Sequence, residues 1–153
     1  MVRKLPIHWA LISNGGEARV YRLRRHPPEF ELVGEATSPT RRQNRRDLES
    51  DASGRAYNVS GPGSHAKQGR VDARDAEEER FIDHVVGRLE RAAARGDFDR
   101  LVVFADARSL GRLRKAWNGN LASRVIAEDA RDLTPQPADA VEKAVRKALD
   151  WPV

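Results

Sequence analysis

The sequence contains no cysteine, a single methionine and few aromatic residues, and it has no long apolar segment. The absence of cysteine excludes a disulfide scaffold, a zinc ribbon and a thiol catalyst. No apolar run approaches the roughly 20 residues that a helix needs to cross a bilayer, so we predict no membrane span. The first residues show neither a long apolar stretch nor a small-residue cleavage site, which predicts no secretory signal and a cytoplasmic location.

What is present is enough apolar and charged material for one ordinary domain. The chain has 153 residues, of which 39% are hydrophobic and 33% are charged. A chain of this length buries a substantial core without disulfides or metal ions. We therefore expect a single domain over residues 1–153.

The positive charge is concentrated in one part of the chain. The formal net charge is +5, and residues 37–74 hold eight basic against four acidic side chains. Four arginines lie within residues 41–46. Guanidinium groups match phosphate oxygens bidentately, so such a run is typical of a nucleic-acid contact, although a solvated surface has the same pattern. The candidate RNA-binding residues are Arg41, Arg42, Arg45, Arg46, Arg55, Lys67 and Arg70.

Three short strands are predicted at the start of the chain. Residues 7–13 are apolar and end at Asn14-Gly15-Gly16, a strong turn signal. Residues 18–24 combine apolar side chains with interspersed arginines, and in a third segment Phe30, Leu32 and Gly34 stand among the glutamates at 29, 31 and 35. Alternation with a period of two is typical of a strand with one buried face. These segments predict an antiparallel meander.

Residues 37–74 then show neither the helical nor the strand period, and they are rich in Ser, Gly, Asn, Arg and Asp. A long segment of this kind predicts a functional or disordered loop. A helix is expected from near Asp75 to Gly96, because residues 77–79 are glutamates that suit a helix N-terminus and apolar residues follow at helical spacing.

The remaining elements complete an α/β pattern. Residues 101–105 predict a buried strand, residues 108–117 a helix, residues 125–127 a fifth strand and residues 137–149 the last helix. Right-handed crossovers place the fourth and fifth strands parallel to each other. The order predicts a ribonuclease-H-like mixed five-stranded sheet, with an antiparallel β-β-β meander, then α-β-α-β-α and helices on both faces. Such domains include nucleases, kinases and non-enzymatic translation modules.

The residues argue against a nuclease. Two-metal catalysis needs several converging carboxylates, but the first strand offers none, and we expect Asp106 to cap the next helix. The four histidines are far apart and show no metal-ligand spacing. We therefore predict no metal site and no cofactor.

One candidate for catalysis is His65, which lies beside Ser64 and near Asp72 in the glycine-rich segment. Residues so close in sequence rarely form a catalytic triad, and a glycine-flanked loop positions them poorly. Gly61-Pro62-Gly63 is not a Walker loop, because no Gly-Lys-Ser/Thr follows it. We expect a non-enzymatic protein and retain His65 as the alternative catalytic residue.

Several motifs resemble the bacterial host attachment protein family. They include Leu48-Glu49-Ser50-Asp51, the Gly-Ser-His that ends at His65, Glu79-Arg80-Phe81 and Asp132-Leu133-Thr134. Together with residues 98–102 and 108–114, they extend the resemblance over nearly the whole chain. The motif residues of the segment between 37 and 74 are Glu49, Asp51, Gly54, Gly61, Gly63, His65 and Gln68.

The resemblance implies a part in bacterial attachment to a host cell. The sequence is also similar to the middle domain of archaeal and eukaryotic peptide-chain release factors and of Pelota-type ribosome-rescue proteins. In release factors a long loop presents Gly-Gly-Gln, whereas this chain has Gly61-Pro62-Gly63 and Lys67-Gln68-Gly69. The similarity therefore implies docking on ribosomal RNA without peptide-release chemistry.

Three hypotheses follow from the sequence. The first is a non-enzymatic RNA- or ribosome-binding module linked to translation or ribosome rescue, which uses the basic segment. The second is a small ester or peptidyl-tRNA hydrolase that uses residues 61–72 with His65 as general base. The third is an adhesion-related protein that acts in attachment to host cells, as the family name implies.

Overall fold

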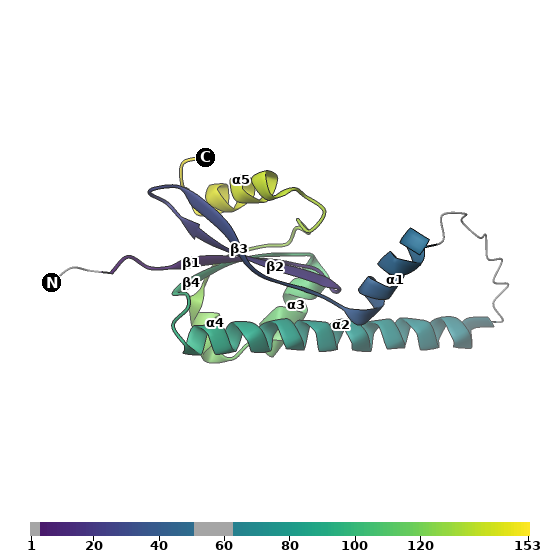
Figure 1. Cartoon of the computed structure of the whole chain (residues 1–153). Helices are drawn as coiled ribbons and strands as arrows, with labels where there is room; N and C mark the ends of the chain where they lie inside the picture. Colours follow the sequence, from purple (N-terminus) through teal and green to yellow (C-terminus); the bar gives the residue numbers. More distant parts are fainter. Residues whose placement is uncertain (1–3, 51–62) are drawn as a thin grey trace.

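The protein is an α/β fold built on one five-stranded sheet (Figure 1). The structure, a computed structural model, describes residues 4–50 and 63–153, and it describes the side chains of all of these except residues 48–50 and 63–65. The elements in chain order are β1 (His8–Ser13), β2 (Glu17–Arg24), β3 (Glu29–Thr37), α1 (Pro39–Ser50), α2 (Gly63–Ala94), β4 (Arg100–Ala105), α3 (Ala107–Ala116), α4 (Gly119–Arg124), β5 (Val125–Asp129) and α5 (Ala138–Ala148).

The sheet combines an antiparallel and a parallel half. Its strand order is β3-β2-β1-β4-β5. β1 to β3 form the antiparallel meander, whereas β4 pairs parallel with both β1 and β5. The predicted mixed five-stranded sheet is therefore confirmed, and β3 lies at one edge of it.

Two apolar cores cover the two faces of the sheet. Leu101 and Val103 of β4 face the core that α2, α3 and α4 cover, while Val102 and Phe104 face the core that α5 covers. A strand that is buried on both faces is apolar throughout, which explains the unbroken apolar run at residues 101–105. Figure 1 shows α5 on one side of the sheet and α2, α3 and α4 on the other, so the helices lie on both faces as predicted.

The expectation of a long irregular loop over residues 37–74 is wrong for residues 39–50 and 63–74, while residues 51–62 lie outside the described part of the chain. The structure has α1 over Pro39–Ser50 and begins α2 at Gly63, twelve residues before the predicted start at Asp75. The described side chains of α1 are all exposed, and in α2 the first buried side chain is that of Phe81. Sequence periodicity marks a helix by its buried stripe, and these helical segments have none.

The first half of α2 extends beyond the sheet, and α1 rises beside it (Figure 1). The glutamates expected at a helix N-terminus therefore lie in the middle of α2. A further difference is α4, a helix of six residues that was not predicted and that buries only Leu121. No helix in the described part of the chain is long and apolar enough to cross a membrane.

Candidate functional site

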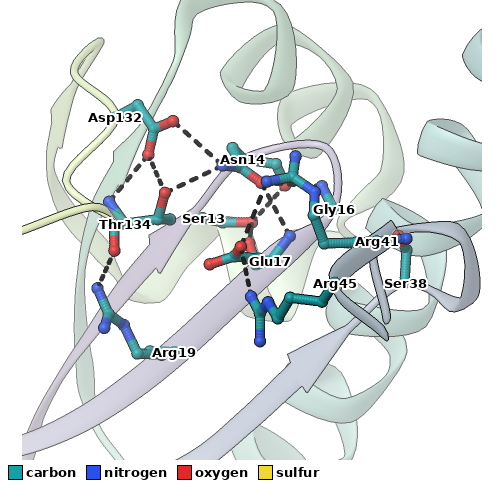
Figure 2. Close-up of polar contacts among 10 residues, drawn as sticks. All are labelled: Ser13, Asn14, Gly16, Glu17, Arg19, Ser38, Arg41, Arg45, Asp132 and Thr134. Atoms are coloured by element: carbon teal, nitrogen blue, oxygen red, sulfur yellow. Dashed lines mark hydrogen bonds and ion pairs between the residues drawn. The ribbon is translucent and has the colours of Figure 1, made fainter. Parts of the chain in front are cut away.

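The arginine-rich helix α1 is anchored to the sheet by a carboxylate at the start of β2. Glu17 Oε1 accepts hydrogen bonds from Arg41 Nη1 at 3.3 Å and from Arg45 Nη2 at 2.7 Å. The two arginines are four residues apart and so share one face of the helix. Figure 2 shows both reaching toward Glu17. This face of α1 is therefore occupied within the protein.

The turn that carries Glu17 is itself fixed by Asn14. The Asn14 side chain accepts hydrogen bonds from the backbone N–H groups of Gly16 and Glu17 at 2.9 and 2.8 Å, and it donates to Asp132 and Thr134 at 3.1 and 3.0 Å (Figure 2). The turn between β1 and β2 is thus tied to the loop that follows β5. Burial works to raise the pKa of Asp132, but hydrogen bonds from Thr134 and Asn14 outweigh it and hold that pKa below its usual 3.8.

A second set of contacts joins α1 to the middle of α2. Glu77 accepts hydrogen bonds from the Thr40 hydroxyl at 2.6 Å and from the Thr40 backbone N–H at 3.1 Å. The next residue, Glu78, binds Arg112 of α3 at 3.1 Å. Two of the three glutamates expected at a helix N-terminus, Glu77 and Glu78, therefore connect three helices.

A groove between α1, α2 and the end of β3 is lined by further basic side chains. It has a volume of about 740 Å³, and its basic lining residues are Arg42, Arg80, His84 and Arg88. The last three recur every fourth residue, which places them on one face of α2 with successive Cα atoms ~6 Å apart along the axis. The side chains of Arg42, Arg80 and His84 have no ion pair with any other residue that the structure describes.

Two carboxylates also line this groove. Glu77 is occupied by Thr40, and the Glu35 side chain is exposed. Arg88 crosses from α2 to the edge strand, where its Nη1 donates to the Glu35 carbonyl oxygen at 3.2 Å. The groove therefore carries more positive than negative charge, and its cations are positioned by α1 and α2.

The structure separates the predicted RNA-binding residues into different groups. Arg41 and Arg45 bind Glu17, whereas Arg42 points into the groove. Arg46 also interacts with another group, so it is not a free cation. Lys67 and Arg70 are exposed on the projecting part of α2, away from the residues that line the groove.

Several predicted residues lie outside the described part of the chain. These are Arg55, Asp51, Gly54 and Gly61, together with the side chains of Glu49 and His65. Gly63 is the first residue of α2, and Gln68 donates a hydrogen bond to Asp72 along that helix at 3.0 Å. Catalysis at His65 stays a prediction.

Sequence reasoning missed Arg80, His84 and Arg88. Their spacing of four residues was visible in the sequence, but we expected this helix only to cover the core. The exposed face of the helix could be identified as part of a site only once the structure placed α1 and the edge strand β3 beside it.

Asp106 has the structural role that we expected. Its Oδ2 accepts a hydrogen bond from the Ser109 backbone N–H at 3.2 Å, which caps α3. Among residues 4–50 and 63–153, no group of three or more His, Cys, Asp or Glu side chains has an arrangement that could hold a metal ion.

Comparison with known proteins identifies a family whose model matches most of the chain. A family model described as "Protein required for attachment to host cells" matches residues 9–145. The match includes all five strands apart from the first residue of β1, and it also includes α1 and α2. A search of curated proteins finds no match.

Proposed function

Because the chain belongs to the family of proteins required for attachment to host cells, we propose that it serves attachment indirectly, as a non-enzymatic RNA-binding protein of the cytoplasm. The ligand we propose is RNA, ribosomal RNA included. The observation that carries the proposal is the groove in which Arg42 of α1 faces Arg80, His84 and Arg88 of α2.

Phosphate groups are the ligands that best suit this arrangement. An arginine donates two parallel hydrogen bonds to a phosphate, and each neutralised phosphate releases condensed counterions. Arg80 and Arg88 are two cations eight residues apart along one helix, and such a pair meets a ligand with several spaced charges better than it meets a single anion. Nucleic acid is such a ligand, and the cytoplasmic location that we propose favours RNA.

We name the ribosome as the place where this RNA is met because the sequence is expected to resemble the middle domain of release factors and Pelota-type proteins. The site we propose differs from the segment that the sequence favoured, since Arg41 and Arg45 bind Glu17 in the protein and Arg42 does not.

The test compares the RNA affinity of the wild-type protein with that of a variant that lacks two arginines of the groove. We would measure the anisotropy of a labelled single-stranded RNA for the wild-type protein and for Arg42→Gln/Arg80→Gln. For single strands, the logarithm of the affinity falls with the logarithm of salt concentration by about 0.7 per phosphate contact, so the double variant should lose about 1.4 from this slope. We expect an affinity loss of about tenfold at low salt.

A matched control removes two charges elsewhere. Lys143→Gln/Lys147→Gln changes the net charge equally on α5, which covers the opposite face of the sheet and whose two lysines are exposed. This control should bind RNA nearly as the wild type does. Absence of RNA binding at low salt, or equal losses in the two double variants, would contradict the proposal.

The link to attachment has its own measurement. Bacteria that produce only Arg42→Gln/Arg80→Gln should attach to host cells as poorly as bacteria that lack the protein, whereas the α5 control should restore attachment. Full attachment by the groove variant would separate the family's role from this groove.

A further inference from the structure

A second, mostly apolar cavity adjoins the basic groove. It has a volume of about 290 Å³ and lies between α2 and the face of the sheet near its β3 edge. Its apolar lining residues include Trp9, Val20, Val33, Val85, Leu89 and Ala92. The Trp9 ring is held by stacking on Phe98, with 4.7 Å between the ring centroids.

The two cavities share a wall. Glu35, Ala36 and Arg88 line both, and the hydrogen bond from Arg88 to the Glu35 carbonyl oxygen lies where they meet. On one side of Arg88 the lining is apolar, and on the other side it carries Arg42, Arg80 and His84. The surface thus pairs an apolar recess with a groove that carries arginines, and Arg88 lies between the two.

We infer that this compound groove takes an unpaired nucleotide of an RNA strand, with its base in the apolar recess and its phosphates on the basic side chains. The inference rests on the proposed function and specifies its ligand. A nucleotide combines a flat ring, whose faces stack on apolar side chains, with an anionic phosphate, which matches the two compartments in both shape and charge.

The strand must be unpaired for a physical reason. A base within a duplex is stacked and paired, so it reaches a recess beneath a helix only when it leaves the stack. At the far rim Arg95 and Asp97 form an ion pair at 2.9 Å, and both line the recess. They give the edge of a base hydrogen-bonding groups of either kind.

Gly34 offers a way to fill the recess without disturbing the fold. It lies in β3 and lines the recess, and a Cβ built on it would come 3.4 Å from Arg88 Nη2, an ordinary contact with the end of a flexible side chain. Valine suits a strand better than glycine does. Gly34→Val should therefore fold normally and occupy the space that we assign to the base.

Gly111→Val is the matched control, because it adds the same side chain on α3 at a position where a Cβ would meet nothing within 4 Å. The experiment compares a single-stranded RNA oligonucleotide, a duplex RNA of equal length and a free nucleoside monophosphate. We expect the wild type and Gly111→Val to bind the single strand about tenfold more tightly than the duplex. Gly34→Val should lose that preference and keep duplex binding.

The outcomes separate this inference from the function on which it rests. Equal binding of single strand and duplex by the wild type, or an unchanged preference in Gly34→Val, overturns the inference and leaves RNA binding through the basic groove intact. A monophosphate that binds as tightly as the oligonucleotide overturns the assignment to an RNA strand. No binding of any RNA at low salt overturns both proposals.

Discussion

Helix α1 should detach from the sheet more often when Glu17 is replaced by an uncharged residue. Glu17→Gln keeps the size of the side chain but removes the carboxylate that binds Arg41 at 3.3 Å and Arg45 at 2.7 Å. None of the side chains at residues 39–47 is buried, so α1 has little apolar packing to hold it. A helix of twelve residues is only marginally stable alone in water. The polar contacts at its base therefore determine how often it opens.

The size of the effect follows from exposure. The three side chains are 25%, 43% and 55% exposed, so each ion pair contributes ~0.2–1 kcal/mol. Loss of both should favour the opened state of α1 by about 1 kcal/mol, which is roughly a fivefold change in its population. The free energy of global unfolding should change by less than about 0.5 kcal/mol, because α1 contributes to neither apolar core.

Amide hydrogen exchange measures this opening directly. In Glu17→Gln the amides of α1 should exchange roughly fivefold faster, while those of β1 and β4 should be unchanged. Added salt should speed the same amides in the wild type, since it screens the ion pairs. Glu29→Gln is a matched control, because Glu29 also binds two arginines, Arg22 and Arg24, at 3.2 Å each, but within the β2–β3 hairpin. Unchanged exchange in α1 would refute the reasoning.

Two further predictions concern stability. Burial and the neighbouring Arg100 lower the pKa of His8 below 6.5, so the unfolded chain takes up the proton first, and the free energy of unfolding should fall as the pH drops from about 6.5 through that lower pKa. In urea titrations at several pH values, His8→Phe should flatten this dependence, and an unchanged slope would refute the assignment. Asp106→Ala should cost ~1 kcal/mol through the lost cap of α3, and Asp106→Ser should recover most of it; equal losses would contradict the capping role.

The sheet could be predicted because its strands carry their burial in the sequence. β4 is apolar on both faces, and β2 combines apolar side chains with interspersed arginines. The turn at Asn14-Gly15-Gly16 also gave the meander correctly. Each of these signals comes from neighbouring residues and requires no knowledge of the rest of the fold.

Helix α1 could not be predicted in the same way. Apart from Pro39 and Leu48 its sequence is polar, so it lacks the apolar stripe by which a helix is recognised. Its contacts with Glu17 and Glu77 join residues that are more than twenty positions apart in the sequence. Only the tertiary arrangement brings these charges together.

Only part of the candidate site could be predicted, again because its residues are brought together by the tertiary arrangement. The arginine run pointed to Arg42, which lines the groove, and equally to Arg41 and Arg45, which bind Glu17. On a helix Arg41 and Arg45 share one face while Arg42 lies on another, and an expected loop gives no basis for separating them. The partners of Arg42 across the groove were identified only from the placement of α2.

The length of α2 has a mechanical consequence. The helix has 32 residues, hence a length of about 48 Å, and its buried side chains begin only at Phe81. The part of α2 before Phe81 projects from the core like a lever. Close to the core it is held by the ion pair from Glu78 to Arg112. A force applied at the free end acts on this region with a long moment arm. A large particle that touches the tip can therefore exert torque on α3, and through it on the sheet, without contacting either.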